Sequence, residues 1–215
     1  MITKSLFEKH CPNKIPVKLG ERIGGGSDGE LFQVLDEPDK VIKLCVIYEW
    51  SLKPYYKYLE MEDTNPYYEY LAIREVIQYV LDNQTIPYVK IHAHQYVGSY
   101  SRQLYDKREQ KFILHYYIMD RLNKISDEEY KVFYSILPHE QDEVRNNFSL
   151  EKAEDILQNL GRSFDIDCAK IFTFCKCIKE SPVAHQDLHP RNVMSDNVGE
   201  YHLIDLDRCV LNINK

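Results

Sequence analysis

Residues 185–194 read His-Gln-Asp-Leu-His-Pro-Arg-Asn-Val-Met, a loop-like stretch around which the rest of the chain is organised. It holds an acid, Asp187, then a proline that stiffens a turn, and then an amide, Asn192, directly before an apolar pair typical of a strand start. Residues 203–207 read Leu-Ile-Asp-Leu-Asp, a short apolar strand that ends in the acid Asp205. An acid, an amide and a second acid in this order suit phosphoryl transfer, in which one carboxylate accepts or orients a hydroxyl and the others hold Mg²⁺. A hairpin with an Asp-rich surface is the alternative.

A glycine-rich turn is predicted near the N-terminus. Near-alternate apolar residues from 15 to 23 predict a strand with one buried face. Residues 30–35 are short and rich in branched and aromatic side chains, so they predict a second strand rather than a helix. Glycines without Cβ atoms let backbone amides approach phosphates closely, although a plain glycine hairpin is the alternative. The residues expected to contact phosphate are Gly24, Gly25, Gly26, Ser27 and Gly29.

The next strand, residues 40–46, contains Val-Ile-Lys and places Lys43 among apolar neighbours. A lysine there needs an anionic partner. A helix over residues 66–82 offers two acids, Glu69 and Glu75. Glu69 lies four residues before Ile73 and shares its inner face, whereas Glu75 points about 200° away at about 100° per residue. Glu69 is therefore the predicted partner of Lys43, with Glu75 as the alternative.

The remaining elements follow from periodicity. No element is assigned to residues 1–14, and residues 48–64 are interpreted as an irregular insertion. Residues 89–97 predict a strand, residues 98–110 a hairpin loop, and residues 112–119 the last strand before a mostly helical region. Helices are expected over residues 127–137, 149–161 and 166–178.

Taken in order, the glycine turn, the Val-Ile-Lys strand, the loop at 185–194 and the strand at 203–207 resemble the motifs of the protein-kinase-like fold. The resemblance spans about residues 17–207. It implies an α+β, two-lobed, kinase-like fold with a five-stranded antiparallel N-lobe sheet and one helix. The C-lobe is expected to be truncated and mostly helical, without an activation segment or later helices. The chain is then one domain, with an N-lobe at about 15–119, a hinge at 120–122 and a C-lobe at 123–215.

The resemblance also implies roles for individual residues, with ATP and Mg²⁺ as the ligands. Asp187 takes the place of the catalytic base, and Asn192 and Asp205 take the places of the metal ligands. Lys43, held by Glu69, would contact the α- and β-phosphates. In the hinge, Met119 is the gatekeeper, and backbone groups of Asp120 and Leu122 would bond the adenine edge. His185 is the structural histidine of the loop.

The sequence departs from the usual kinase pattern in four ways. Gln186 replaces the arginine that meets an activation-loop phosphate, and His189 replaces a lysine that lies near the γ-phosphate. Asp205-Leu206-Asp207 replaces Asp-Phe-Gly, and Asp207 is either a further metal contact or a surface acid. The chain stops at Lys215. This layout resembles the minimal kinases that some bacterial pathogens secrete as effectors and some compact viral or phage kinases, which implies constitutive activity.

Composition and net charge limit the classes of partner and the cellular compartments that are expected for this chain. The 215 residues carry a net charge of −7, which argues against binding to nucleic acid or to anionic membranes. Six cysteines without regular spacing predict reduced thiols rather than a disulfide framework. No apolar run suggests a signal peptide or a membrane span. We therefore expect a cytoplasmic-type soluble monomer, or one delivered into a host cell without a cleaved signal peptide.

The sequence thus predicts a constitutive protein kinase that transfers the ATP γ-phosphoryl group to a protein hydroxyl, with Ser/Thr favoured. Because the expected second lobe is small, the protein substrate would be recognised as a folded surface, for example on a host protein. A small-molecule phosphotransferase of the aminoglycoside type is the first alternative, in line with His189-Pro190 and Asp205-Leu206-Asp207. A non-catalytic pseudokinase scaffold is the second.

Overall fold

The computed structural model describes residues 2–26, 29–49, 66–84, 87–104, 107, 109–137, 148–160 and 166–211. These residues form a mixed α+β fold that divides into two compact units, residues 1–74 with 91–121 and residues 75–90 with 122–215. The division after residue 121 falls within the predicted hinge. Residues 75–90, which were predicted in the first lobe, belong to the second unit.

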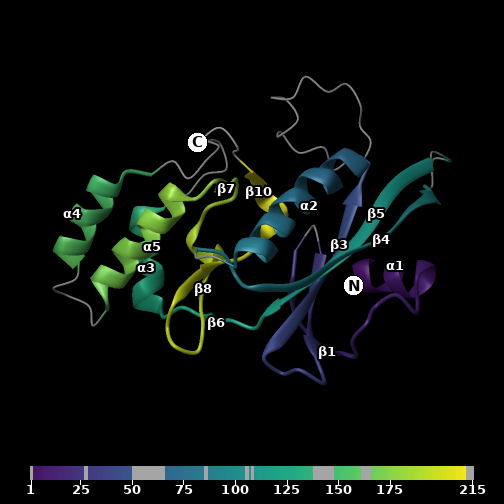
Figure 1. The fold of residues 1–215 in the computed structure, drawn as a ribbon, viewed down its shortest axis with the longest axis horizontal. Helices are drawn as coiled ribbons and strands as arrows, with labels where there is room; N and C mark the ends of the chain where they lie inside the picture. The colour runs from purple at the N-terminus through teal and green to yellow at the C-terminus, as the bar shows by residue number, and fades with distance from the viewer. Residues whose placement is uncertain are drawn as a thin grey trace. The chain divides into compact units, whose positions relative to one another are not determined.

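The first unit is built on a five-stranded antiparallel sheet, as predicted (Figure 1). The strand order is β1-β2-β3-β5-β4. The strands are β1 (Leu19–Gly25), β2 (Gly29–Val34), β3 (Lys40–Tyr48), β4 (Ile91–Gln103) and β5 (Glu109–Asp120).

The predicted hairpin loop at residues 98–110 is wrong, because β4 and β5 continue through most of it. The two strands stay paired from Ile91↔Met119 to Gln103↔Glu109. β4 is an edge strand, and its half after Val97 alternates between half-buried and exposed residues. An edge strand with one solvent-exposed face carries many polar residues. Its composition therefore resembles that of a loop, although its backbone is extended.

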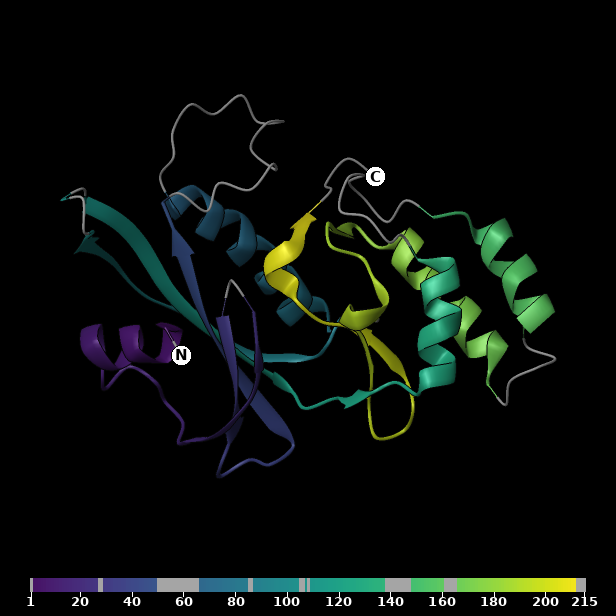
Figure 2. The same ribbon diagram turned by 180° about the vertical axis from the view of Figure 1, so that it is seen from behind.

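Helix α1 (Ile2–His10) was not predicted, and it gives the sheet a second helix where one was expected. Its residues Leu6 and Phe7 are buried in a core that includes Ile42, Leu44 and Phe112. The Lys4 backbone N–H donates to Glu30 Oε2 over 2.9 Å and fixes the helix to β2. Figure 2 shows α1 lying beside the sheet. The helix shows only a short apolar stripe and no acid in its first turn, so its start carries little local signal.

Helix α2 (Pro66–Asn83) matches the predicted helix at 66–82. Its Tyr70 ring lies 5.9 Å from the His94 ring and 5.5 Å from the His115 ring, which places the start of α2 on the sheet. Leu44 and Leu114 belong to the core under α1, and side chains alternate along strands, so the neighbours Cys45 and His115 face the other way. The start of α2 and α1 therefore cover opposite faces.

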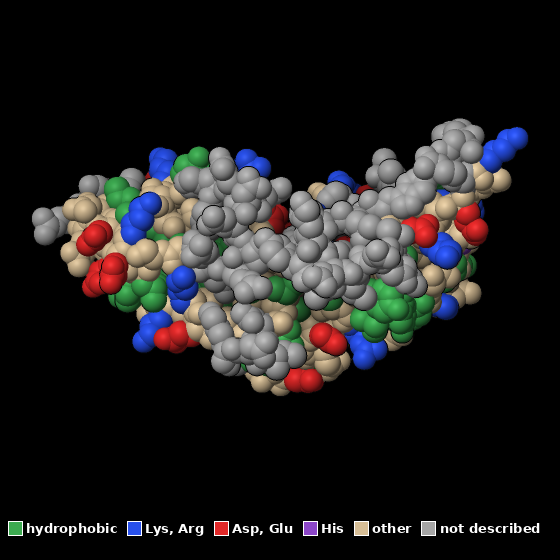
Figure 3. Space-filling view, turned by 90° about the horizontal axis from the view of Figure 1, so that it is seen from above, with side chains coloured by type: hydrophobic (Ala, Val, Ile, Leu, Met, Phe, Trp, Pro, Cys, Tyr) green, Lys and Arg blue, Asp and Glu red, His purple; other side chains and the backbone are tan. Residues whose placement is uncertain are grey.

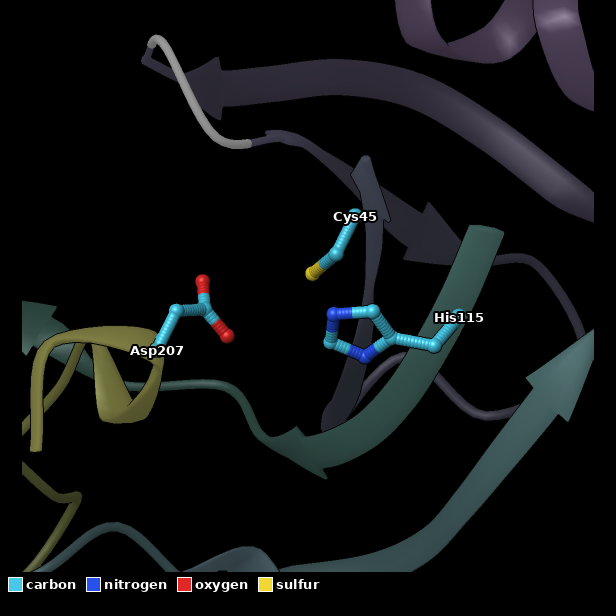
Figure 4. A group of neighbouring side chains, drawn as sticks. All are labelled: Cys45, His115 and Asp207. Atoms are coloured by element: carbon cyan, nitrogen blue, oxygen red, sulfur yellow. The ribbon is translucent and has the colours of Figure 1, made fainter. Parts of the chain in front are cut away.

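A polar cluster lies under the start of α2. Cys45 and His115 are paired across β3 and β5, and the Cys45 Sγ lies within 4.8 Å of a His115 ring nitrogen (Figure 4). Burial lowers the pKa of His115, and burial together with nearby Arg74 lowers the pKa of His94 to about 4. Both imidazoles are therefore neutral at pH 7. Asp207, the third side chain in Figure 4, belongs to the second unit.

The second unit contains three helices at the predicted positions, α3 (Asp127–Ile136), α4 (Leu150–Leu160) and α5 (Cys168–Glu180). Ser126 caps α3 in a capping box with Glu129, the start signal expected from Ser-x-x-Glu. Phe133 of α3, Phe174 of α5 and Tyr201 pack edge to face or tilted, with ring centroids 5.1–5.8 Å apart. The helices lie side by side in Figure 1 and supply the core of this unit.

Short strands complete the second unit. β7 (Val183–His185) pairs with β10 (Cys209–Leu211), and β6 (Asn123–Lys124), β8 (Val193–Ser195) and β9 (Tyr201–Leu203) form a small antiparallel sheet. The segment after α2 joins this sheet, because the Val89 N–H donates to the Leu203 carbonyl over 3.0 Å.

The described surface shows mixed charge. In the face viewed in Figure 3, Lys and Arg side chains are interspersed with Asp and Glu side chains. All six cysteines are free thiols. Among the described residues, none of the helices has the length and apolar character needed to cross a membrane.

We expect Tyr201→Phe to lower the free energy of unfolding by about 1.5–3 kcal/mol, because the Tyr201 hydroxyl donates to the Glu129 carboxylate over 2.5 Å across 72 residues of chain. Burial alone would raise the pKa of Glu129, but hydrogen bonds from Tyr201 and Ser126 lower it. The stabilisation is therefore complete above the ordinary glutamate pKa of about 4.3 and is lost as the pH falls through the lower folded pKa.

Urea unfolding of wild type and Tyr201→Phe at pH 7 and pH 3.5 measures this difference. It should shrink at the lower pH. Tyr68→Phe, at an exposed tyrosine, is the matched control and should change stability by less than about 0.5 kcal/mol. A difference that is the same at both pH values would mean that the Glu129 charge contributes nothing.

Candidate functional site

The loop between β7 and β8 is anchored by His185. The His185 Nε2 lies 2.8 Å from the Ile204 carbonyl, and its Nδ1 accepts from the Asp187 N–H over 3.2 Å. Burial lowers the pKa of His185, whose side chain is 1% exposed, so the ring is neutral at pH 7. A neutral ring with Nδ1 as acceptor carries its proton on Nε2 and donates it to the carbonyl. His185 therefore ties the loop to the segment that carries Asp205.

The loop positions Asp187 beside His189. The His189 Nε2 lies 3.6 Å from the Asp187 Oδ2, and the His189 Nδ1 accepts from the Arg191 N–H over 3.1 Å. The Arg191 hydrogen bond again places the proton of the neutral ring on Nε2, facing the carboxylate. Both side chains keep part of their surface, 21% for Asp187 and 29% for His189, so a ligand can reach the carboxylate.

Asn192 ends the 3-10 turn Pro190–Asn192 and is 7% exposed. Its side-chain Nδ2 donates to the Asp187 carbonyl over 2.9 Å, and its own carbonyl accepts from the Ile204 N–H over 3.0 Å. The first bond uses the amide nitrogen, so the carbonyl oxygen Oδ1 is the atom left to serve as a metal ligand. The second bond continues the β8–β9 pairing, in which Val193 is opposite Leu203.

This pairing brings Asp205 next to the loop. Asp205 has φ 66° and ψ 52°, in the left-handed region where non-glycine residues are uncommon. Its charge acts on His185, whose pKa it raises against the larger effect of burial. The sequence predicted an acid at the end of the short strand but not its left-handed backbone.

Asp207 is 7% exposed, so the surface acid, one of the two alternatives for this residue, is wrong. It lies in the 3-10 turn Leu206–Arg208, which the Arg208 N–H closes by donating to the Asp205 carbonyl over 3.0 Å. The Gln186 N–H donates to the Arg208 carbonyl over 2.7 Å, and Cys209 pairs with His185 across β10 and β7. The segment after Asp205 is thereby held to the loop.

In the first unit, the predicted glycine turn joins β1 and β2, as expected for glycines between two strands. Ser27 lies outside the described residues. A Cβ on Gly29 would lie 2.4 Å from the Leu44 carbonyl oxygen, and Gly25 has φ +150° with the Gly29 carbonyl 2.8 Å from its would-be Cβ. A Cβ on Gly26 would meet nothing within 4 Å, and one on Gly24 would make only ordinary contacts. The fold thus requires glycine at positions 25 and 29 but not at 24 and 26.

Lys43 lies on the sheet face that α2 covers, since it is two residues before Cys45 on β3. Its Nζ lies 5.8 Å from the centre of the Tyr117 ring. Glu69, on α2 next to Tyr70, is 8% exposed, whereas Glu75 is exposed. A buried carboxylate requires a partner, and an exposed one does not. The helical phase that favoured Glu69 thus corresponds to a real difference in burial.

The predicted hinge residues lie at the end of β5 and just beyond it. Met119 is 4% exposed and pairs with Val41 of β3 and Ile91 of β4. The Asp120 carboxylate interacts with His92 Nε2. The chain passes from the first unit to the second after residue 121, so Leu122 belongs to the second unit.

Asp187, Asn192 and Asp205 therefore come together within the second unit, and Lys43 and Glu69 belong to the first. Three residues were not predicted: Tyr130 and Tyr134 of α3 and Arg191 of the loop, which line a cavity with His189 and Pro190. Arg191 was visible inside the quoted stretch. The tyrosines recur at an i, i+4 spacing on α3, out of phase with the buried Val132 and Phe133, a signal that could have indicated a second functional face.

No protein-family model matches this chain, and no curated protein matches its sequence. Among solved structures, the fold is similar to WbdD, with a TM-score of 0.43 and 13% sequence identity over 90% of this chain and 33% of that chain. The chain thus spans about a third of the WbdD chain. This likeness assigns neither a family nor an activity, so inference about function begins from the side chains described above.

Proposed function

We propose that this chain is a constitutive ATP- and Mg²⁺-dependent protein kinase that transfers the γ-phosphoryl group to a protein hydroxyl, with Ser/Thr favoured. One observation carries the proposal. Phosphoryl transfer needs the groups that Asp187, Asn192 and Asp205 supply. Asn192 bonds to Asp187 over 2.9 Å and to Ile204, the residue directly before Asp205, over 3.0 Å. In a hairpin whose acids have no function, the side-chain amide of Asn192 would not need to bond to Asp187.

The donor set suits Mg²⁺, a hard cation that prefers carboxylate and amide oxygens. The Asn192 Oδ1 and the Asp205 carboxylate would hold the ion. Bound Mg²⁺ supplies charge neutralisation on the phosphate oxygens during transfer. The cost of the left-handed backbone at Asp205, about 1–2 kcal/mol for a non-glycine residue, is of the kind found where function fixes a side-chain direction.

Asp187 is the proposed base. Its carboxylate accepts the proton of the acceptor hydroxyl, whose oxygen forms a bond to the γ-phosphorus as the bond from that phosphorus to the bridging oxygen breaks, and ADP leaves. His185, held neutral, and Asn192 position the carboxylate through the loop backbone. His189 lies beside this carboxylate, with its Nε2 3.6 Å from the Asp187 Oδ2.

The first unit is proposed to bind the nucleotide. The backbone of the glycine turn would contact phosphates, and Lys43 would contact the α- and β-phosphates. Lys43 and Glu69 carry opposite charges on the α2-covered side of the sheet, which supports their proposed pairing. Backbone groups of Asp120 and Leu122 beside Met119 are proposed to recognise adenine.

Constitutive activity is supported by the segment after Asp205. The Arg208–Asp205 and Gln186–Arg208 backbone hydrogen bonds, with the β7–β10 pairing, hold this segment to the loop without a phosphate. Gln186 stands where an arginine would be needed to read such a phosphate. A switch would have to break these bonds, so none is expected.

The proposal is tested by incubating the purified full chain with γ-labelled ATP and Mg²⁺ in bacterial and eukaryotic lysates. A labelled protein band that disappears with EDTA and exceeds the background of an Asp187→Asn sample is expected. Phosphoamino-acid analysis then distinguishes Ser/Thr from Tyr. Label in metabolites alone would replace the proposal by a small-molecule phosphotransferase. No transfer to either, with ATP still bound, would leave a scaffold.

The glycine turn allows nucleotide binding to be separated from folding. Gly26→Ala should leave the free energy of unfolding within about 0.5 kcal/mol of wild type, since its methyl group enters open space. It should weaken ATP binding roughly tenfold, about 1.4 kcal/mol, because the methyl group keeps the backbone from the phosphates. Gly29→Ala should instead destabilise the fold by about 1–3 kcal/mol, because its Cβ overlaps the Leu44 carbonyl.

Denaturant unfolding and ATP titration calorimetry on both variants check this pair of outcomes. Gly24→Ala, which makes only ordinary contacts, serves as a second probe of the turn. If Gly26→Ala and Gly24→Ala both bind ATP as tightly as wild type, the turn is a plain hairpin.

A further inference from the structure

A cavity of about 230 Å³ lies between α3 and the 3-10 turn of the loop, entirely within the second unit. Its lining residues are Tyr130, Tyr134, His189, Pro190 and Arg191. Two of these come from α3 and three from the loop, and α3 packs on this turn. Pro190 is buried, whereas Arg191 and Tyr134 are exposed at the surface. The proposed function uses none of the three residues that were missed from the sequence.

The cavity adjoins the proposed base. His189 lines it, and the His189 Nε2 is 3.6 Å from the Asp187 Oδ2. A group bound there is therefore one imidazole ring away from the carboxylate that receives the acceptor hydroxyl. The Arg191 N–H donates to the His189 Nδ1 and holds the ring in place, so the two residues form one side of the cavity together.

The lining combines positive charge with aromatic faces. Within the part of the chain that the structure describes, no carboxylate pairs with the Arg191 guanidinium. The guanidinium presents a planar set of donors that matches carboxylate and phosphate oxygens. The Tyr130 and Tyr134 rings are stacked at 27° with centroids 6.3 Å apart, and both residues line the cavity.

We propose that this cavity is an acceptor subsite that binds an anionic side chain next to the phosphorylated hydroxyl, with Arg191 as the specificity-determining residue. The proposal rests on the proposed function and names its substrate class: a protein hydroxyl flanked by an acidic or phosphorylated residue. Arg191 binds the anion, and the tyrosines pack on the stem of the same side chain.

Size favours a side chain over a metabolite. Cavities that enclose whole small molecules usually span about 300–1,000 Å³. At about 230 Å³ this cavity is smaller, and it suits one side chain of a larger acceptor.

The net charge of the chain shows that an anionic acceptor must be recognised by local contacts in the cavity. The chain carries a net charge of −7, so its overall field disfavours acidic acceptors. Recognition of an anionic residue must therefore come from short-range contacts. Removing the single guanidinium should consequently have a large effect on acidic acceptors.

The test uses three synthetic serine peptides of equal length whose flanking residues are glutamate, phosphoserine or arginine. We expect kcat/KM to be higher for the glutamate and phosphoserine peptides than for the arginine peptide, and the two anionic peptides show which anion fits better. Arg191→Glu should lower kcat/KM for both anionic peptides by about 10- to 100-fold, as for loss of a hydrogen bond to a charged group, and should raise it for the arginine peptide. The effect should be mainly in KM.

Lys131→Glu is the matched control, because Lys131 is an exposed cation on α3 that does not line the cavity. Equal kcat/KM for all three wild-type peptides, or equal losses in Arg191→Glu and Lys131→Glu, would overturn the subsite. Binding of the same peptides, followed by fluorescence anisotropy, reads the subsite without catalysis. Charge-selective binding that depends on Arg191, in a chain that transfers no phosphate, would support the subsite and overturn the kinase; binding that ignores charge overturns the subsite.

Discussion

Asp187→Asn is expected to reduce the rate of phosphoryl transfer at saturating ATP by at least about 100-fold, the scale of a general base. The substitution keeps the shape of the side chain and its backbone, whose N–H and carbonyl bond to His185 and Asn192. It removes only the carboxylate that is proposed to receive the hydroxyl proton. The loop should therefore keep its structure, and ATP affinity should change little.

Initial rates with a labelled acceptor, ATP calorimetry and thermal unfolding together measure this outcome. Asp155→Asn, at an exposed acid on α4 in the same unit, is the matched control and should retain full activity. Transfer by Asp187→Asn within about threefold of wild type would show that Asp187 is not the base. A large fall in melting temperature would instead show that the variant acts through folding.

Asp205→Asn and Asp205→Gly are both expected to lose transfer by at least about 100-fold and to weaken Mg²⁺-dependent ATP binding. Loss of a residue that only supports a metal ligand costs about 10–100-fold in metal affinity, and loss of a direct ligand should cost no less. Both replacements accept the left-handed backbone of φ 66°, asparagine because it is enriched there and glycine because it has no Cβ.

The stabilities of the Asp205 variants distinguish the loss of a metal ligand from strain in the left-handed backbone. Each should change the free energy of unfolding by no more than about 1 kcal/mol, whereas Asp205→Val should cost more, because a branched side chain resists a positive φ. Calorimetry with ATP at several Mg²⁺ concentrations gives the metal dependence. If Asp205→Asn binds ATP with wild-type Mg²⁺ dependence, Asp205 is not a metal ligand.

Much of the fold could be predicted because its signals are local. The five strands of the sheet and four of the helices show their periodicity, caps or turn residues within about ten residues of chain. The capping box at Ser126 and Glu129 and the apolar phase of α2 are examples. α1 and the outer half of β4 escaped because their structure depends on partners distant in sequence, the core under α1 and the eleven-residue ladder with β5.

The candidate site likewise has features that a local sequence pattern predicts and features that depend on contacts distant in sequence. The sequence alone selected the residues that are proposed to carry the chemistry, since Asp187, Asn192, Asp205 and Lys43 stand in motifs whose order and spacing are readable. It also distinguished Glu69 from Glu75 by helical phase. These are properties of single segments, for which backbone geometry fixes the direction of each side chain.

Only the tertiary structure decided how these segments act on each other. Pairing of β8 with β9 bonds Asn192 to Ile204, and the fold alone places Asp205 in a left-handed conformation and buries Asp207. The packing of α3 on the loop creates the cavity shared by Tyr130 and Arg191, which are about sixty positions apart in the sequence. Contacts of that range depend on the packing of the whole unit, and no local pattern encodes them.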